Sequence, residues 1–518
     1  MQHKYLLPIF LLIAQTAVAQ FQNILIHEGT NPKEPAIGMN PKNVNELVAG
    51  ANGDNIYYSH DGGLTWSQDK LTSSFGIWGD PCVVADTSGN FYYSHLSNTG
   101  GATGWLDRIV IQKSTDGGVS WNDGSFTGLN DDKDQDKPWM AFDASPGSPF
   151  KGNLYVAWTE FDTYGDTDPE YRSRIRCAVS NDGAATWSEP VVVSQFTGDC
   201  IDSDNTAEGA VPAIGPNGEV YTAWSLNDTI WFDRSINGGQ TWLNQDIFIS
   251  NQVGGWKFNV PGLNRCNGLP VTACDRTTGA IYVNWTDKRN GTDDTDVFLS
   301  KSTDGGNTWS APVRVNNDPP GKHNFLTWMA IDQTSGHLFF VFYDRRDYDD
   351  WQTGVYLAYS TDGGETFANL KISNLPFTPQ PDKFFGDYTN IVAHDGHVHP
   401  IWERQVNGAA SIWTAVLAYP VGIQSPDFFA LQTKLESFPN PFSESATISF
   451  NMATEQTLSL TVLDLMGRVV VPVFTQKKYP PGLHEVKLDN VELGLHAGIY
   501  FLKLSNGYAT ETCKVVVR

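Results

Sequence analysis

Six copies of an eight-residue segment, written S-T-D-G-G-x-T-W in its commonest form, recur along this chain of 518 residues. Successive copies begin 55 to 67 residues apart, and a period of this length is typical of stacked supersecondary units. The copies occupy residues 59–66, 114–121, 180–187, 235–242, 302–309 and 360–367. The chain is therefore expected to consist mainly of one repeated unit, and each copy of the segment is expected to close a hairpin at the edge of that unit.

Around each copy lie four short stretches with the period-2 alternation of β-strands, and the Gly-rich spacing between them leaves no room for long helices. Seven candidate inner strands can be aligned, beginning at residues 34, 80, 137, 210, 269, 327 and 387. The seventh unit has a third strand from Ser411 but no fourth, and residues 21–28 form a candidate for the missing one. A ring that shares strands between its first and last units hides its edges. The prediction is an all-β, seven-bladed propeller closed by the N-terminal strand, with six blades as the fallback.

Turn chemistry explains the residues of the repeated segment. An Asp can accept hydrogen bonds from backbone N–H groups of its own turn, and paired glycines supply positive φ. The replacements Asn237, Ala184 and Phe367 fit this structural role, whereas a catalytic residue would tolerate such drift poorly. The segment resembles the Asp-box (BNR) repeat of sialidases and other secreted propellers, over residues 21–420. In that family the boxes lie at the blade periphery, so the resemblance implies a sialidase-like fold and not, by itself, catalysis.

The two ends of the chain read as export signals. Residues 1–19 have the pattern of a secretory signal peptide, with an apolar run too short to span a bilayer, and no later stretch is long enough to be a transmembrane segment. Residues 421–433 read as a linker, and residues 434–518 alternate strongly enough to form a small immunoglobulin-like β-sandwich. This last region carries P-N-P-F, D-L-M-G-R and G-I-Y-F-L-K-L in order, and it resembles the type IX secretion sorting domain of Bacteroidetes.

That resemblance implies that the type IX secretion machinery is a partner. It also implies a secreted or outer-cell-surface location once the signal peptide and sorting domain are cleaved. A carbohydrate-binding sandwich is the alternative for residues 434–518, but no Trp follows Trp413 to build an aromatic platform. Residues 20–420 are then the exported propeller.

Charge and cysteine content narrow the partners further. The formal net charge of −24 excludes nucleic acid, which needs clustered Lys and Arg, and leaves extracellular carbohydrate as the expected contact. Six cysteines in an exported chain are expected to form disulfides, with all 15 pairings open. They show no C-x-x-C spacing that would indicate zinc or redox chemistry.

Resemblance to sialidases implies several arginines for a substrate carboxylate, a Tyr nucleophile with a carboxylate partner, and an Asp acid/base. The first Arg position is missing, because the region before the first box reads P-K-E-P-A-I-G-M and no Arg precedes Arg108. The remaining candidates are Tyr388, Glu208 and Asp80 for catalysis and Arg289, Arg345 and Arg404 for substrate binding. The alternative is that Tyr388 packs in an inner strand and that the D-x-R pairs are salt bridges within one blade.

Acidic loops raise a separate possibility. Asp132, Asp134 and Asp136 alternate before the third inner strand, and Ca²⁺ takes about 6 to 8 oxygen ligands, which makes these three a candidate Ca²⁺ site. Lys137 stands where an EF-hand needs Gly, so that motif is rejected, and solvated loops are the alternative.

Three hypotheses about function stay open. The first is a secreted sialidase-superfamily propeller that binds, or binds and hydrolyses, an extracellular glycan as a glycoside hydrolase. The second is a non-catalytic platform for adhesion or assembly. The third is a polysaccharide lyase, which would use Tyr388 as base beside Arg404.

Overall fold

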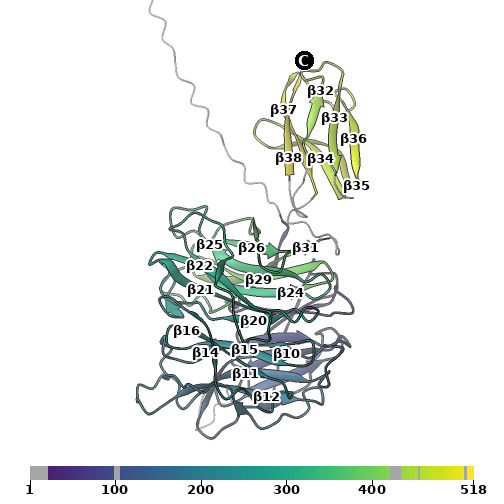
Figure 1. Cartoon of the computed structure of the whole chain (residues 1–518). Helices are drawn as coiled ribbons and strands as arrows, with labels where there is room; N and C mark the ends of the chain where they lie inside the picture. Colours follow the sequence, from purple (N-terminus) through teal and green to yellow (C-terminus); the bar gives the residue numbers. More distant parts are fainter. Residues whose placement is uncertain (1–20, 98–105, 420–432, 453–455, 507–509) are drawn as a thin grey trace, which may run out of the picture. The chain divides into compact units, whose positions relative to one another are not determined.

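A computed structural model describes residues 21–97, 106–419, 433–452, 456–506 and 510–518 (Figure 1). The described residues form strands and no helix, which confirms the all-β class. The chain divides into two compact units, one of them residues 22–428 and the other containing residues 429–518. The expected signal peptide and nearly all of the expected linker lie outside the described residues.

The described residues of the larger unit form seven antiparallel sheets of four or five strands and one small two-stranded sheet, and in six of the seven the strands follow chain order from the inner to the outer strand. The first three sheets are β2 (Ala36–Met39), β3 (Leu47–Ala51), β4 (Asn55–Ser59), β5 (Ser67–Lys70); β6 (Gly79–Ala85), β7 (Phe91–Leu96), β8 (Ile109–Ser114), β9 (Ser125–Thr127); and β10 (Asp134–Phe142), β11 (Leu154–Phe161), β12 (Ser173–Ser180), β13 (Val191–Val192). The next three are β14 (Glu208–Ile214), β15 (Val220–Ser225), β16 (Thr229–Ser235), β17 (Ile247–Asn251); β20 (Val271–Cys274), β21 (Ile281–Gly291), β22 (Asp294–Ser302), β23 (Val313–Arg314); and β24 (Asn324–Asp332), β25 (His337–Asp344), β26 (Gly354–Ser360), β27 (Ala368–Lys371).

The seventh sheet joins the two ends of this unit. It contains β28 (Asn390–His394), β29 (His397–Val406), β30 (Ala409–Ala415) and, on the outside, the N-terminal strand β1 (Asn23–Glu28), while β31 (Leu417–Ala418) pairs with β29. β1 runs antiparallel to β30, with Asn23 opposite Ala415 and Glu28 opposite Ser411. The N-terminal segment therefore supplies the strand that the seventh repeat lacks.

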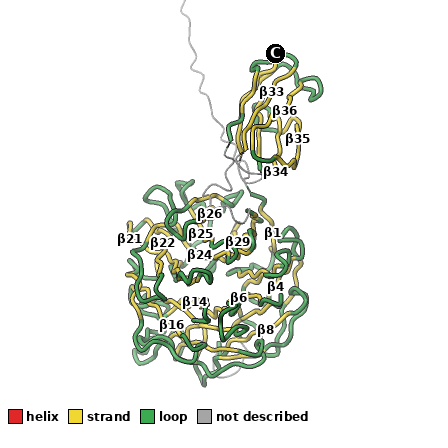
Figure 2. The backbone as a smooth tube through the Cα atoms, turned by 45° about the vertical axis from the view of Figure 1, so that its right-hand side comes forward, coloured by secondary structure: helices red, strands yellow, loops and turns green. Residues whose placement is uncertain are grey.

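The first strands of the seven sheets contact one another in chain order, and β28 also contacts β2. Figure 2 shows these strands around a common centre, and we call residues 23–418 the ring. Its apolar core lies between neighbouring sheets: Phe232 of the fourth sheet packs with Trp285 of the fifth, and Ile401 of the seventh packs with Leu47 of the first. Burial between sheets thus holds the ring together, and it includes the junction between the last sheet and the first.

The six boxes have the predicted turn chemistry. In the fifth, the carboxylate of Asp304 accepts hydrogen bonds from the backbone N–H (2.9 Å) and the hydroxyl (2.6 Å) of Thr308. Gly305 and Gly306 have φ of 74° and 88°, the left-handed region that favours glycine. These contacts explain why the segment recurs, and none of them involves the centre of the ring.

The smaller unit contains two sheets around one core. One is β32 (Glu436–Phe438), β33 (Ser445–Met452), β36 (Gly482–Asp489), and the other is β35 (Val469–Tyr479), β34 (Gln456–Leu463), β37 (Gly498–Ser505), β38 (Thr510–Val517). Ile448 and Phe450 of the first sheet and Leu460 and Leu502 of the second belong to the same buried cluster.

The expected disulfides are not formed. All six cysteines carry free thiols, and five of them are buried. These five fill space in the interior as small side chains, and the sulfur of Cys82 also accepts a hydrogen bond from Met140 N at 3.3 Å.

Candidate functional site

Several sheets have a residue with a left-handed backbone in or shortly before their first strand. Glu34, Asp80 and Lys137 adopt φ of 54°, 53° and 49°, and Gly209 and Gly386 take the same left-handed conformation. At Asp80, Lys137 and Gly209 the register with the second strand also shifts, as in a β-bulge. For a non-glycine residue this conformation costs about 1 to 2 kcal/mol. Three charged side chains held at that cost mark this end of the ring as a candidate site.

Buried charges gather at this end. Lys137 Nζ lies 2.9 Å from Asp387 Oδ2 and 3.9 Å from Glu208 Oε1. Arg265 Nε donates to Asp387 Oδ1 at 2.9 Å, and its Nη1 lies 3.6 Å from Asp202 Oδ2. We define the acid cluster as the carboxyl groups around Lys137 and Arg265, namely Glu34, Asp80, Asp136, Asp202, Glu208 and Asp387.

The remaining members of the acid cluster are tied in by hydrogen bonds. Glu34 Oε1 accepts from Asp387 N at 3.0 Å, and Asn52 donates to Glu34. Asn52 also accepts from Asp80 N at 2.9 Å, and Asp80 interacts with Asp136. The first, second, third, fourth and seventh sheets therefore all contribute to one buried polar network.

Burial and charge divide the carboxyl groups into two kinds. Burial opposes ionisation of Asp387, but the charges of Lys137 and Arg265 outweigh it and lower the pKa to about 2. Burial, reinforced by neighbouring carboxylates, raises the pKa of Asp80 and Glu208 well above the usual range and that of Glu34 to about 7. The cluster thus places Asp387, whose ionisation is favoured by two cations, beside carboxyl groups whose ionisation is opposed by burial. Acid-assisted bond cleavage uses two carboxyl groups whose pKa values differ in this way.

Tyr388 lies next to the acid cluster in a layer of aromatic rings. Its ring centroid is 5.1 Å from that of Trp139 and 6.1 Å from that of Trp328. The side chain is only 8% exposed, and its hydroxyl forms no hydrogen bond with any described residue. Burial raises the Tyr388 pKa well above its usual range, and Glu208 contacts Lys137 instead of the phenol. Tyr388 therefore lacks an activating base in this structure.

The three predicted substrate-binding arginines lie elsewhere. Arg289 pairs with Asp287 at 2.5 Å, Arg345 donates to Pro261 O at 2.6 Å, and the Arg404 guanidinium lies over the Trp413 ring at 5.6 Å. Within the described ranges none of them pairs with the acid cluster. The Asp287–Arg289 pair is the local D-x-R salt bridge that the sequence offered as an alternative. Arg404, which the lyase hypothesis needs beside Tyr388, lies over the Trp413 ring.

The predicted Ca²⁺ ligands do not form one ligand set. Asp132 is exposed, Asp134 accepts a hydrogen bond from Tyr164 N at 2.8 Å, and Asp136 belongs to the acid cluster. Across the described residues, no group of three or more His, Cys, Asp or Glu side chains is placed to hold a metal ion.

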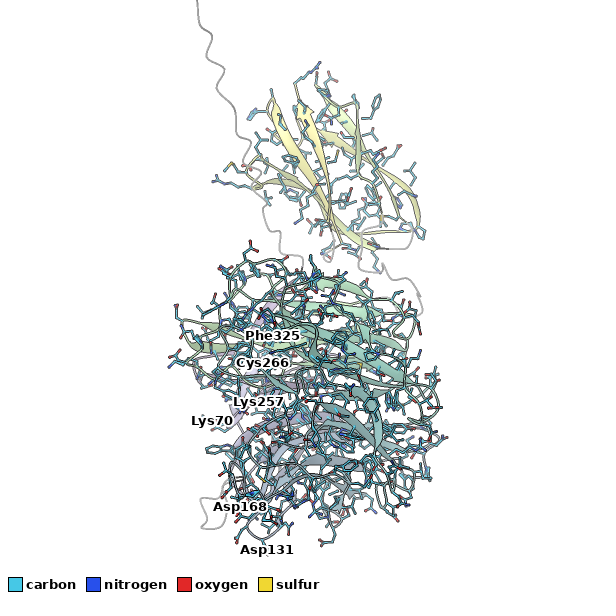
Figure 3. The ribbon with its side chains drawn as sticks, turned by 60° about the vertical axis from the view of Figure 1, so that its left-hand side comes forward. Lys70, Asp131, Asp168, Lys257, Cys266 and Phe325 are labelled. Atoms are coloured by element: carbon cyan, nitrogen blue, oxygen red, sulfur yellow. The ribbon has the colours of Figure 1, made fainter. Side chains whose placement is uncertain are left out.

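An extra hairpin covers the acid cluster, and the sequence reading missed it. It spans residues 252–268 and contains β18 (Lys257–Phe258) and β19 (Cys266–Asn267), whose residues Lys257 and Cys266 are labelled in Figure 3. We call it the covering hairpin. The boxes on either side of this segment begin 67 residues apart, the longest such spacing in the chain. This extra length was the sequence signal that could have predicted an inserted hairpin.

Hydrogen bonds hold the covering hairpin to three other parts of the ring. Trp256 Nε1 donates to Thr206 O at 3.2 Å, and Asn267 Nδ2 donates to Asp387 O at 2.9 Å. The Pro261 carbonyl accepts from Arg345, and the hairpin also brings Arg265 to the cluster. The cavity left beside Lys137, Glu208 and Arg265 measures ≈ 30 Å³, which is room for water but not for a sugar.

Comparison with known families supports the two recognised segments. Residues 436–518 match the family described as secretion system C-terminal sorting domain, and residues 57–68 match the BNR/Asp-box repeat. The chain therefore carries a type IX sorting domain, which directs it to the outer surface or the medium. No described segment is a helix with the length and apolar character needed to cross a membrane.

Comparison with whole proteins identifies no activity for this chain. A search of the curated proteins finds no match. Among solved structures, similar ones are a Hadza microbial sialidase (15% identity, 72% of this chain and 73% of that chain, TM-score 0.43) and the NanB sialidase of Streptococcus pneumoniae (8%, 72% and 83%, 0.43). An α-L-arabinanase of Penicillium chrysogenum is similar at 13% identity over 76% of this chain and 97% of that chain, with a TM-score of 0.41.

Proposed function

We propose that the ring is a seven-bladed propeller of the sialidase type that binds an extracellular glycan at the acid cluster and hydrolyses a glycosidic bond there. The sorting domain supports the extracellular setting. The observation that carries the proposal is the pair formed by Glu208 and Asp387 on one ammonium, that of Lys137. Burial raises the pKa of Glu208 well above its usual range, whereas Lys137 and Arg265 lower the pKa of Asp387 to about 2.

The two carboxyl groups have distinct roles in this proposal. Glu208 Oε2 forms no hydrogen bond with any described residue, so its proton is free to pass to the oxygen of the departing sugar. The Asp387 carboxylate stabilises the positive charge that develops on the sugar ring during cleavage. Water then bonds to the anomeric carbon, and its released proton returns to the Glu208 carboxylate. Lys137 positions both groups, and the covering hairpin must move aside for a sugar to enter.

A neutral glycan suits the cluster better than a sialylated one. Six carboxyl groups face only two cations, and Glu34 occupies the segment where the first carboxylate-binding Arg was expected. Lys137 and Arg265 are both already paired with Asp387, so neither cation is left to bind the carboxylate of an acidic sugar. This part of the proposal departs from the sialidase activity that the Asp boxes suggested.

Release of reducing sugar from neutral and sialylated oligosaccharides tests the proposal with the full chain. We expect release from at least one neutral glycan, none from sialosides, and a loss of at least 100-fold in Glu208→Gln, since general acid catalysis contributes about 10²- to 10⁴-fold. Glu189→Gln, an exposed change, serves as the matched control. Equal rates in Glu208→Gln and the wild type would refute the assignment.

A non-catalytic platform is the second candidate, and one observation favours it. The covering hairpin seals the acid cluster down to a cavity of ≈ 30 Å³. If the hairpin never opens, the charges only fasten it to the ring. In that case glycans neither bind nor react, and Lys137 and Asp387 affect stability alone.

A further inference from the structure

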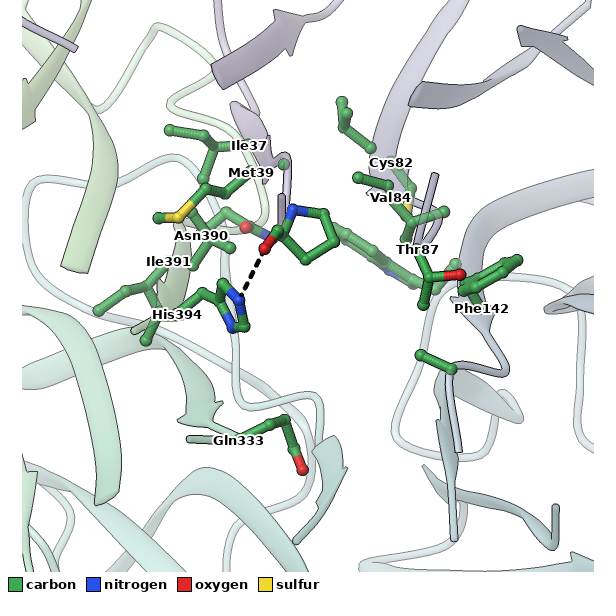
Figure 4. A pocket seen from close by; sticks show the side chains of 18 of the residues that line it. Ile37, Met39, Cys82, Val84, Thr87, Phe142, Gln333, Asn390, Ile391 and His394 are labelled. Carbon is green, nitrogen blue, oxygen red and sulfur yellow. Dashed lines mark hydrogen bonds between the residues drawn. The ribbon is translucent and has the colours of Figure 1, made fainter. Parts of the chain in front are cut away.

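A much larger cavity lies at the other end of the first strands. Its volume is ≈ 550 Å³, within the range of about 300 to 1,000 Å³ typical of small-molecule sites (Figure 4). Residues from six of the seven sheets line it. Trp139 and Trp328 line both this cavity and the small one beside Tyr388, so they separate it from the acid cluster.

The inner part of this cavity is apolar. Ile37 and Met39 of β2 form one wall, and Ile391 of β28 lies beside them (Figure 4). The Trp139 and Trp328 rings, with centroids 4.1 Å apart and planes inclined by 43°, add an aromatic surface. An apolar body inserted here would bury its surface against aliphatic and aromatic side chains, which favours binding by about 0.8 kcal/mol for each CH₂ group.

The charged side chains at the mouth of the cavity are cationic. Lys42 and Arg276 stand there together with His394, at or just beyond the ends of the first strands, and no Asp or Glu is among the described residues that line the cavity. This is a strong local contrast in a chain of net charge −24. Of the three, His394 is already engaged, because its Nε2 donates to Pro41 O at 3.1 Å (Figure 4).

Arg276 has guanidinium N–H groups that no described residue accepts. Its backbone N and its Nε both contact Gln333 Oε1, at 3.0 and 3.3 Å, and it forms no ion pair with any described carboxylate. The nearest acidic side chains, Asp143 and Asp275, are held by their own turns, for example through Ser145 N on Asp143. The Arg276 guanidinium therefore keeps its terminal N–H groups for an anion, in the forked geometry that suits a carboxylate.

We propose that this cavity is a second ligand site, which binds a small amphipathic carboxylate with its apolar body against Trp139 and Trp328 and its carboxylate on Arg276. The site is distinct from the acid cluster and does not depend on the hydrolytic function. Its cationic, largely apolar character is the opposite of the acidic environment around Lys137.

Calorimetric titration of the full chain with hexanoate, octanoate and decanoate tests the site. We expect one saturable site, with affinity rising about tenfold for every two CH₂ groups. Decanol, which lacks the charge, should bind at least tenfold more weakly than decanoate. Arg276→Gln should lower decanoate affinity at least tenfold and leave decanol binding unchanged, whereas the surface change Lys70→Gln should alter neither.

A second variant tests the site independently, in case Arg276→Gln fails to fold. Thr87 is exposed and lines the mouth, so Thr87→Trp should block decanoate, and Thr277→Trp, an exposed position that does not line the cavity, should not. Absence of saturable decanoate binding to the wild type would overturn the proposal. So would equal decanoate binding in the wild type and in either Arg276→Gln or Thr87→Trp.

Discussion

Substitution of Gly306 by Ala would test how the boxes fix one sheet against the next. An ideal Cβ at Gly306 would lie 2.2 Å from Cε1 and 2.6 Å from Cζ of Phe232, a fully buried ring of the preceding sheet. Overpacking of this kind costs about 1 to 3 kcal/mol, and Ala at φ 88° adds about 1 to 2 kcal/mol. We expect Gly306→Ala to destabilise the ring by about 2 to 5 kcal/mol.

The neighbouring glycine supplies the control. Gly305 has φ of 74°, but a Cβ there meets nothing nearer than Arg234 Nη1 at 3.4 Å. Gly305→Ala should therefore show the backbone cost alone, about 1 to 2 kcal/mol. The third box already has Ala184 at the second glycine's position, with φ of 63°, so the backbone itself accepts a methyl group there.

Urea unfolding followed by tryptophan fluorescence is the assay. Every Trp of the chain lies between Trp66 and Trp413, so the signal reports on the ring and not on the C-terminal unit. Free energies are compared at equal slopes of the transition. If Gly306→Ala and Gly305→Ala lowered the free energy of unfolding equally, close packing against Phe232 would not be what fixes the fifth sheet against the fourth.

Three further outcomes are expected. The folded-state pKa of Glu34 is raised from 4.5 to about 7, so the folded ring keeps a proton that the unfolded chain has lost, and stability falls as pH rises from about 4.5 to 7. In urea titrations, the free energy of unfolding of Glu34→Gln should therefore exceed that of the wild type by up to about 3 kcal/mol at pH 8 and equal it at pH 4. An equal increase at both pH values would contradict this reasoning. Lys137→Met removes the ammonium group that the buried carboxylates share and should lower the free energy of unfolding by about 3 to 5 kcal/mol. The control Lys70→Met, in an exposed pair with Asp54, should lower it by less than about 0.5 kcal/mol. Removal of residues 434–518 should leave the ring inside a bacterium that has type IX secretion, as measured by immunoblot of cell and medium fractions, and equal amounts outside would refute the role of the sorting domain.

Much of the fold could be read from the sequence because it rests on local signals. The Asp304 turn contains its own hydrogen-bond partners within five residues, so its pattern survives in every copy. The pairing of β1 with β30 is long-range, yet it was foreseeable because the seventh repeat lacked one strand. Cysteine pairing was not foreseeable in this way, since export permits disulfides without requiring them.

The site was less accessible to sequence reasoning. Tyr388, Glu208 and Asp80 were selected individually, and the structure does place them at one end of the ring. Lys137 was read only as a break in an EF-hand pattern, and Arg265 was not considered, because neither has a local motif. Their role comes from distances across the ring: the contact between Lys137 and Asp387 joins residues 250 positions apart.

The most direct test of the acid cluster compares Glu208→Gln with the wild type on neutral aryl and alkyl glycosides whose leaving groups differ in acidity. An acid that protonates the departing oxygen matters for a poor leaving group and hardly at all for one that leaves as a stable anion. The account predicts a loss of at least about 100-fold in kcat/KM for a methylumbelliferyl or alkyl glycoside and less than about tenfold for a dinitrophenyl glycoside. A uniform loss across both substrates, or no loss on either, would contradict Glu208 as the acid.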